Sequence, residues 1–187
     1  MKLFNLSMAV AIVSAIAAPA FANNSDDAFN GFKTVCAATA ADYPAVIAAS
    51  ATDGWAVTQV TGGSTMPGVS VTAKAARKKS VSESALTLFA TQGLTQAGGG
   101  LTVNTCTVST DRGDLATVVA KAQGWLGFAP VSTTPDSTTF HLTMAGGAPQ
   151  NVASDGINAA AASTGFETLT IKRNGNTLTL DLVKFKK

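Results

Sequence analysis

The sequence is poor in charged and metal-binding side chains. Only 13% of its residues are Asp, Glu, Lys or Arg, against about 25% in a typical soluble domain, and the formal net charge is +2. It contains one histidine and two cysteines. Because metal sites gather several His, Cys, Asp or Glu ligands, this composition predicts no metal site. Nucleic-acid binding is also not expected, since it calls for a basic stripe with interleaved aromatic residues.

Motifs for cofactors and for catalysis are missing as well. The glycine-rich stretches 98–100 and 146–147 lack the lysine of a phosphate-binding loop and the spacing of a dinucleotide site. His141 is the only histidine, and no G-x-S-x-G serine elbow is present for it to serve as general base. The acids Asp111 and Asp114 are explained by helix capping. We therefore expect no cofactor and no catalytic residue that a motif would reveal.

The first 22 residues have the pattern of a secretory signal peptide. Lys2 precedes an apolar run at 8–18, and the small residues Ala20 and Ala22 stand where a signal peptidase cleaves. The apolar run is shorter than the ~20 residues that a transmembrane helix needs. We expect a periplasmic or secreted protein in which residues 23–187 form one domain without a transmembrane segment.

The two cysteines are expected to form a disulfide. Cys36 and Cys106 both follow the predicted signal peptide, and an oxidising compartment favours pairing of an even number of cysteines. The alternative is two free thiols packed in the core. Each cysteine also precedes a Gly-Trp pair by the same spacing, but few other identities align, so the spacing leaves open whether the chain arose by duplication.

The stretch 101–125 is predicted to form a half-buried strand followed by an amphipathic helix. Apolar and polar residues alternate from 101 to 104, with a period of two. The polar run ending at Asp111 offers helix N-cap residues, with Asp114 in the first turn. An apolar stripe with helical spacing follows: Leu115, Val118, Val119 and Ala122. Gly124 is expected to end this helix.

Two further helices are predicted near the N-terminus. Asp26 or Asp27 is expected to cap the first, which carries an apolar side made of Phe29, Phe32, Val35 and Cys36. The second is expected to start near Pro44, with Asp42 upstream, and to end at Gly54. A third, Ala-rich helix is predicted from 157 to 162, capped by Asn151 or Ser154.

Alternating patterns predict strands at 55–60, 84–91 and 138–144, the second of which Gly93 is expected to end. The region 69–79 fits a strand or a helix, and the sequence leaves it ambiguous.

The C-terminal 22 residues predict a β-hairpin. Asn174-Gly175 is a preferred type I′ turn pair, which would place Ile171 opposite Leu178 and Leu169 opposite Leu180. Such a hairpin has one apolar and one polar face. The predicted fold class is therefore α+β: an antiparallel sheet of about five to six strands, with helices packed on one face and a C-terminal hairpin.

Five residues are candidates for an interaction site. Arg77, Lys78 and Lys79 form the only tight basic run, which we expect to be exposed because a core does not bury three unpaired cations. Trp55 and Trp125 each follow a glycine at a predicted helix end, where packing is the ordinary role and partner binding the alternative.

The functional hypothesis is an exported, non-catalytic module of the bacterial envelope or secretome that binds an unidentified protein or envelope component. Its oligomeric state is not readable from the sequence. The alternatives are a small exported hydrolase whose active site follows no motif, and an enzyme inhibitor. A deep polar pocket would favour the hydrolase, and an apolar patch would favour binding.

Overall fold

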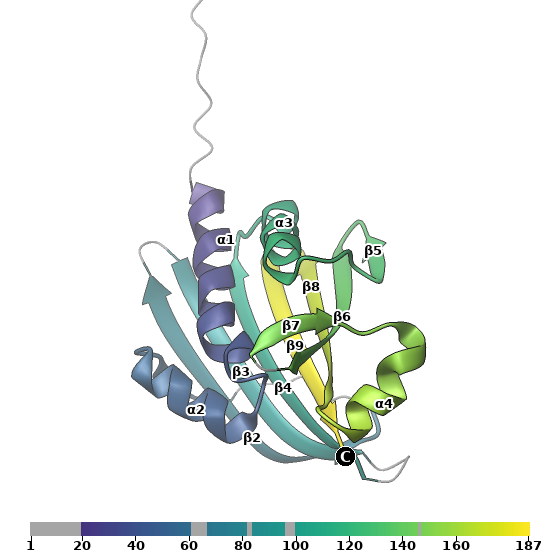
Figure 1. Cartoon of the computed structure of the whole chain (residues 1–187). Coiled ribbons are helices and arrows are strands. Elements are labelled where there is room, and N and C mark those ends of the chain that lie inside the picture. The colour runs from purple at the N-terminus through teal and green to yellow at the C-terminus, as the bar shows by residue number, and fades with distance from the viewer. Residues whose placement is uncertain (1–19, 61–66, 82–83, 96–99, 146) are drawn as a thin grey trace, which may run out of the picture.

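The computed structural model describes residues 20–60, 67–81, 84–95, 100–145 and 147–187 (Figure 1). Most of the predicted signal peptide, and glycines 98, 99 and 146 of the two glycine-rich stretches, lie outside this described part. No helix within it is long and apolar enough to span a membrane.

The described residues form an α+β fold with nine strands in one antiparallel sheet. The helices are α1 (Ala20–Gly31), the π-helix η1 (Phe32–Ala37), α2 (Tyr43–Thr52), α3 (Leu115–Leu126), the 3-10 helix η2 (Ser154–Gly156) and α4 (Ile157–Ala162). The strands are β1 (Ala56–Thr58), β2 (Val69–Val81), β3 (Ser84–Thr95), β4 (Thr102–Asp111), β5 (Ser132–Thr134), β6 (Ser137–Ala145), β7 (Ala148–Asn151), β8 (Phe166–Asn174) and β9 (Thr177–Lys186).

The strand order is β1-β2-β3-β4-β9-β8-β6-β5, and β7 also pairs with β6. Each half of the sheet follows a helix in the chain: β1 to β4 come after α2, β5 to β9 come after α3, and the two halves join where β4 pairs with β9. The equal Cys-to-Trp spacing does not mark this resemblance between the halves, because Cys36 lies in η1 and Cys106 in β4.

The sheet has more strands than the five to six predicted. The predicted strand at 55–60 is present as β1, whereas β5 and β7, which are three and four residues long, are too short for alternation to reveal. The ambiguous region 69–79 is part of the long strand β2. Strand β3 also runs past Gly93, where a Cβ atom would lie 2.7 Å from the Ser70 carbonyl oxygen; this glycine permits a close approach of β2 and does not end the strand.

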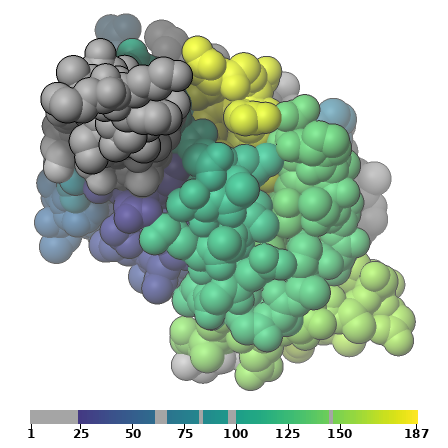
Figure 2. Space-filling view, turned by 90° about the horizontal axis from the view of Figure 1, so that it is seen from above, coloured from purple at the N-terminus to yellow at the C-terminus, as the bar shows by residue number. Residues whose placement is uncertain are grey.

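The hydrophobic core lies between one face of the sheet and the helices α1, η1, α2 and α3 (Figure 1). Five aliphatic side chains from the C-terminal hairpin are fully buried there: Leu169, Ile171, Leu178, Leu180 and Leu182. Seen from above, α1 and α3 lie side by side (Figure 2). The predicted apolar face of the hairpin is thus the face that the helices cover.

The predicted disulfide is present. Cys36 and Cys106 are bonded, with their Cα atoms 5.4 Å apart, and both are fully buried. The bridge ties η1 to the middle of β4. A disulfide is compatible with an oxidising extracellular compartment.

The C-terminal hairpin forms, but its register differs from the prediction by two positions. Asn174 pairs with Thr177, so the turn residues are Gly175 and Asn176, and Ile171 lies opposite Leu180. Gly175 adopts a φ of 58° at the first turn position. Because side chains alternate with a period of two, a shift of two residues leaves the apolar face unchanged.

Helix α3 begins and ends slightly later than predicted. Its N-cap is Asp114, whose Oδ2 accepts a hydrogen bond from the Thr117 backbone N–H at 2.7 Å, whereas Asp111 still belongs to β4. The helix continues through Gly124 and ends before Gly127, which adopts the left-handed conformation that favours glycine.

Helix α1 also differs from the prediction, because it starts at Ala20, upstream of both proposed caps. Asp26 instead forms an ion pair with Lys121 at 3.1 Å, and Asp27 accepts a hydrogen bond from Ser84 Oγ at 2.7 Å. The cap of α2 is as predicted, since Asp42 accepts a hydrogen bond from the backbone N–H of Ala45.

Helix α4 spans the predicted residues, and β6 covers the predicted strand at 138–144. Neither proposed cap of α4 acts as one: Asn151 ends β7, and Ser154 begins η2. No side-chain hydrogen bond caps this helix.

Candidate functional site

A groove of about 510 Å³ opens between α2 and the strands β1 and β2. Its wall on the α2 side includes Pro44 and Ile47, and Val57 of β1 contributes an aliphatic side chain that is 77% exposed. Lys74 and Arg77 of β2 are the two charged residues in the lining. The groove is therefore mainly apolar with a positive charge on its β2 side.

Arg77 is held in this groove by the segment that links α2 to β1. Its guanidinium Nη1 donates a hydrogen bond to the Trp55 carbonyl oxygen at 3.3 Å, while its Nε is buried without a hydrogen-bond partner. The neighbouring cation Lys74 is exposed. Arg77 thus offers the groove a positioned cation, and Lys74 an exposed one.

The predicted basic run does not form one exposed patch. It lies inside β2, which pairs with β1 on one side and β3 on the other, so its side chains alternate between the two sheet faces. Lys78 is exposed, but Arg77 and Lys79 are half-buried, which corrects the expectation that all three cations are exposed. Lys79 lies on the helix side and pairs with Asp53 at 2.8 Å.

Trp55 lies between α2 and β1 and Trp125 lies in α3, and of the two only Trp125 is partly exposed. Trp55 is 3% exposed, and its Nε1 donates a hydrogen bond to Asp53 Oδ2 at 2.9 Å. Burial alone would raise the pKa of Asp53, but the hydrogen bonds from Lys79 and Trp55 outweigh it and lower the pKa. Trp55 is therefore a core residue beside the groove.

Trp125 is half-buried on α3. Its ring meets Phe29 and Phe32 edge-on, each at 6.3 Å between ring centroids, and the Lys33 ammonium lies 5.8 Å from it. These contacts join α3 to α1 and η1, which is the packing role expected of a tryptophan at a helix junction.

A row of polar residues, which the sequence analysis missed, lies on the helix-covered face of the sheet. Gln92 of β3, Asn104 of β4, Lys184 of β9 and Glu167 of β8 are direct neighbours in register and form one row across four strands. We call these four residues the polar row. Lys184 lies near the C-terminal end of β9, so the polar row is toward the end of the sheet where the C-terminus is found (Figure 1).

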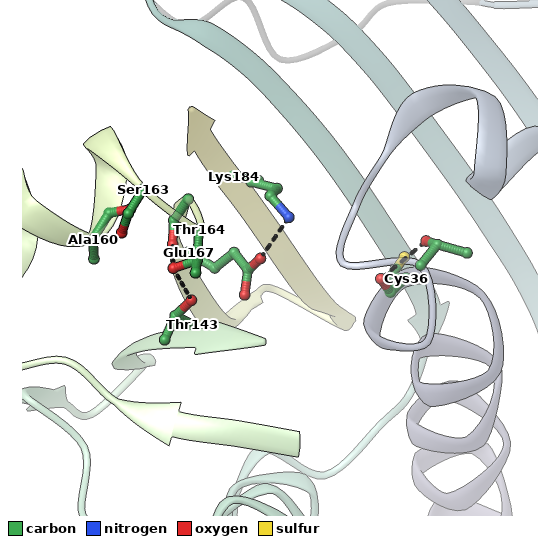
Figure 3. A network of polar contacts seen from close by, with 9 residues as sticks. Cys36, Thr143, Ala160, Ser163, Thr164, Glu167 and Lys184 are labelled. Carbon is green, nitrogen blue, oxygen red and sulfur yellow. Dashed lines mark hydrogen bonds and ion pairs between the residues drawn. The ribbon is translucent and has the colours of Figure 1, made fainter. Parts of the chain in front are cut away.

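Glu167 and Lys184 form a buried ion pair in the polar row. Lys184 Nζ lies 3.1 Å from Glu167 Oε1, and the side chains are 16% and 0% exposed for Lys184 and Glu167 (Figure 3). Burial raises the pKa of Glu167, although the charge of Lys184 and its hydrogen bond act in the opposite direction. The carboxylate is thus held where its charged form is costly.

Asn104, on the other side of Lys184, is 7% exposed, and its Oδ1 has no hydrogen-bond partner. It precedes Cys106 by two residues in β4, so both side chains point to the helix-covered face. Alternation could have shown that Glu167 and Lys184 stand at apolar positions, because Glu167 has the same parity as Leu169 and Lys184 the same parity as Leu182.

The polar residue His141 lies on the opposite sheet face, where it is half-buried against Phe166 with 5.1 Å between ring centroids. Its Nδ1 is buried and has no hydrogen-bond partner. Within the described residues, no three His, Cys, Asp or Glu side chains are placed to hold a metal ion.

No protein-family model, curated protein or solved structure matches this chain.

Proposed function

We propose that this chain is an exported, non-catalytic binding module and that the groove between α2 and β1–β2 receives its partner. The observation that carries the proposal is the combination of an apolar groove with two cations and no acidic residue in its lining. Val57, which lines it, is the most exposed of the large hydrophobic side chains in the described residues.

The chemistry of the groove favours a partner with an aliphatic side chain next to a carboxylate. Burying Ile47 and Val57 against such a side chain supplies affinity, since each Å² of apolar surface removed from water contributes about 25 cal/mol. Lys74 and Arg77 select the negative charge and steer its approach. A protein segment or an acidic envelope component has both features.

The hydrolase alternative would place its acid at Glu167, the buried carboxyl group with a raised pKa. Glu167 is fully buried and already bound to Lys184, so a substrate does not reach it in this conformation. The inhibitor alternative uses the same groove and differs only in the partner, which would be an enzyme.

A capture experiment with envelope extract tests the proposal. The mature protein is compared with Val57→Glu and Lys74→Glu, which place negative charge in the groove, and with Val131→Glu as a matched control. Val131 is 46% exposed and lies outside the groove, between α3 and β5. We expect a partner that the parent and Val131→Glu retain and both groove variants lose. Equal capture by all four proteins would exclude the groove as the binding surface.

A further inference from the structure

Three residues of the polar row bring an amine, an amide and a carboxyl group together on neighbouring strands. Lys184 of β9 is directly opposite Asn104 of β4 on one side and Glu167 of β8 on the other. Directly opposite residues project from the same sheet face with Cβ atoms about 4.5–5.5 Å apart. The flexible four-carbon stem of Lys184 is long enough to carry Nζ to either neighbour.

Burial around these groups favours the neutral form of Glu167. Asn104 and Glu167 are almost completely buried, and the Lys184 side chain is only 16% exposed. Burial raises the pKa of Glu167, so transfer of a proton from the Lys184 ammonium to this carboxylate removes two charges from a low-dielectric site. The product is a free amine beside an amide carbonyl, since Asn104 Oδ1 has no other partner.

We propose that Lys184 Nζ and Asn104 Cγ become joined by an intramolecular isopeptide bond, with Glu167 as the catalytic acid and base. The observations that carry this proposal are the register of the three strands, the 3.1 Å contact between Lys184 and Glu167, and the buried Asn104 oxygen without a partner. The inference is independent of the binding groove.

The reaction needs no further reactant. Glu167 takes a proton from the Lys184 ammonium, the Nζ lone pair attacks Asn104 Cγ, and the protonated Glu167 stabilises the negative charge that develops on Oδ1. Nζ then loses a second proton through Glu167 to Asn104 Nδ2, the Cγ–Nδ2 bond breaks, and ammonia leaves. The products are one secondary amide, one ammonia molecule and a neutral Glu167 carboxylic acid.

The bond would join β4 to β9, the two strands at which the halves of the sheet meet. It lies two residues from Cys106, so a redox-insensitive cross-link would stand beside the disulfide on β4. β4 would then be tied covalently to η1 through sulfur and to β9 through the amide.

The test is the intact mass of the folded, exported protein, measured after denaturation. We expect a mass lower than that of the mature sequence by one ammonia molecule, beyond the two hydrogens of the disulfide. Tandem mass spectrometry after reduction and proteolysis should find the peptide containing Asn104 linked to the peptide containing Lys184. In Asn104→Asp the same bond would form with loss of water instead of ammonia.

Glu167→Gln and Lys184→Arg are expected to keep the full mass, and Lys186→Arg, the exposed lysine two residues further along β9, is the matched control that should still lose ammonia. The wild-type measurement decides even if a variant fails to fold. A wild-type protein with the full mass apart from the disulfide, or a loss of ammonia that tandem spectra assign to another residue, would overturn the proposal.

Discussion

Thr107 Oγ1 donates a hydrogen bond to Asp181 Oδ1 at 2.7 Å, across β4 and β9, on the sheet face opposite the helices. Burial raises the pKa of Asp181, and the hydrogen bond from Thr107 and the charge of Lys172 offset this only in part. The folded protein therefore binds the proton of the Asp181 carboxyl group more tightly than the unfolded chain does.

Asp181→Asn is expected to raise the melting temperature at neutral pH, because it removes the cost of burying the charge and keeps an oxygen that accepts from Thr107. A raised folded-state pKa means that wild-type stability falls as pH rises from the ordinary pKa of Asp through the folded-state value. The advantage of the variant should thus shrink toward about pH 4. Thermal melts of both proteins across this range measure it. A lower melting temperature at neutral pH would show that the carboxylate stabilises the fold.

Cys36→Ser should destabilise the protein by up to about 4 kcal/mol, the chain-entropy estimate for a loop closed across a separation of 70 residues. Denaturant unfolding of parent and variant measures the difference. Reductant should reproduce the loss in the parent and have no effect on the variant. Two titratable thiols in the unfolded, non-reduced parent would contradict the bridge.

Asp114→Ala should cost about 1 kcal/mol of stability, the typical value of an N-cap residue, because the Thr117 N–H loses its acceptor. Hydrogen bonds from Thr117 lower the pKa of Asp114, so the contribution is present at neutral pH and lost as pH falls through the folded-state pKa. Asp111→Ala, at the end of β4, is the control and should cost less. Urea unfolding of both variants at neutral and acid pH is the measurement.

Native trypsin is expected to cut slowly after Arg77, Lys78 and Lys79, because β2 is hydrogen-bonded to strands on both sides there. The exposed C-terminal Lys186 should be cut first. Mass spectrometry of a digestion time course follows both sites, and the unfolded protein, in which all sites are open, is the control. Early cleavage in the 77–79 run would mean that this edge of the sheet opens readily.

Export is expected to remove residues 1–22, so that the mature protein starts at Asn23. Cleavage there would leave Asn24, which donates a hydrogen bond to the Asp111 carbonyl oxygen at 2.9 Å, as the second residue. N-terminal mass spectrometry of the exported fraction tests this. An intact Met1 would contradict it.

Elements with strong local signals could be predicted from the sequence. Asp42 before Pro44 predicted the start of α2, and alternation predicted the apolar face of the C-terminal hairpin. The predicted register of the hairpin was wrong because Asn174-Gly175 and Gly175-Asn176 are both suitable turn pairs. The alternation of apolar and polar residues is the same in either register.

The candidate sites depend on pairing between distant segments, which periodicity does not encode. The groove needs α2 to lie over β1 and β2, and the position of Asn104 opposite Lys184 needs β4 to pair with β9. The sequence shows that Glu167 of β8 and Lys184 of β9 stand at apolar positions, but it does not show which residues lie next to them across the sheet.

The pairing of β4 with β9 also orders events during synthesis. The first half of the sheet, β1 to β4, is synthesised with the edge of β4 unpaired, and its partner β9 is the last strand to be made. An unpaired edge is a template for aggregation. Cys36 and Cys106 both precede β9 in the chain, so in an oxidising compartment their bond can hold η1 over β4 before β9 pairs. A chain that ends before β9 would keep the edge of β4 unpaired. Pairing of β9, the last ten residues of the sheet, is therefore the step that protects this protein from aggregating with its own copies.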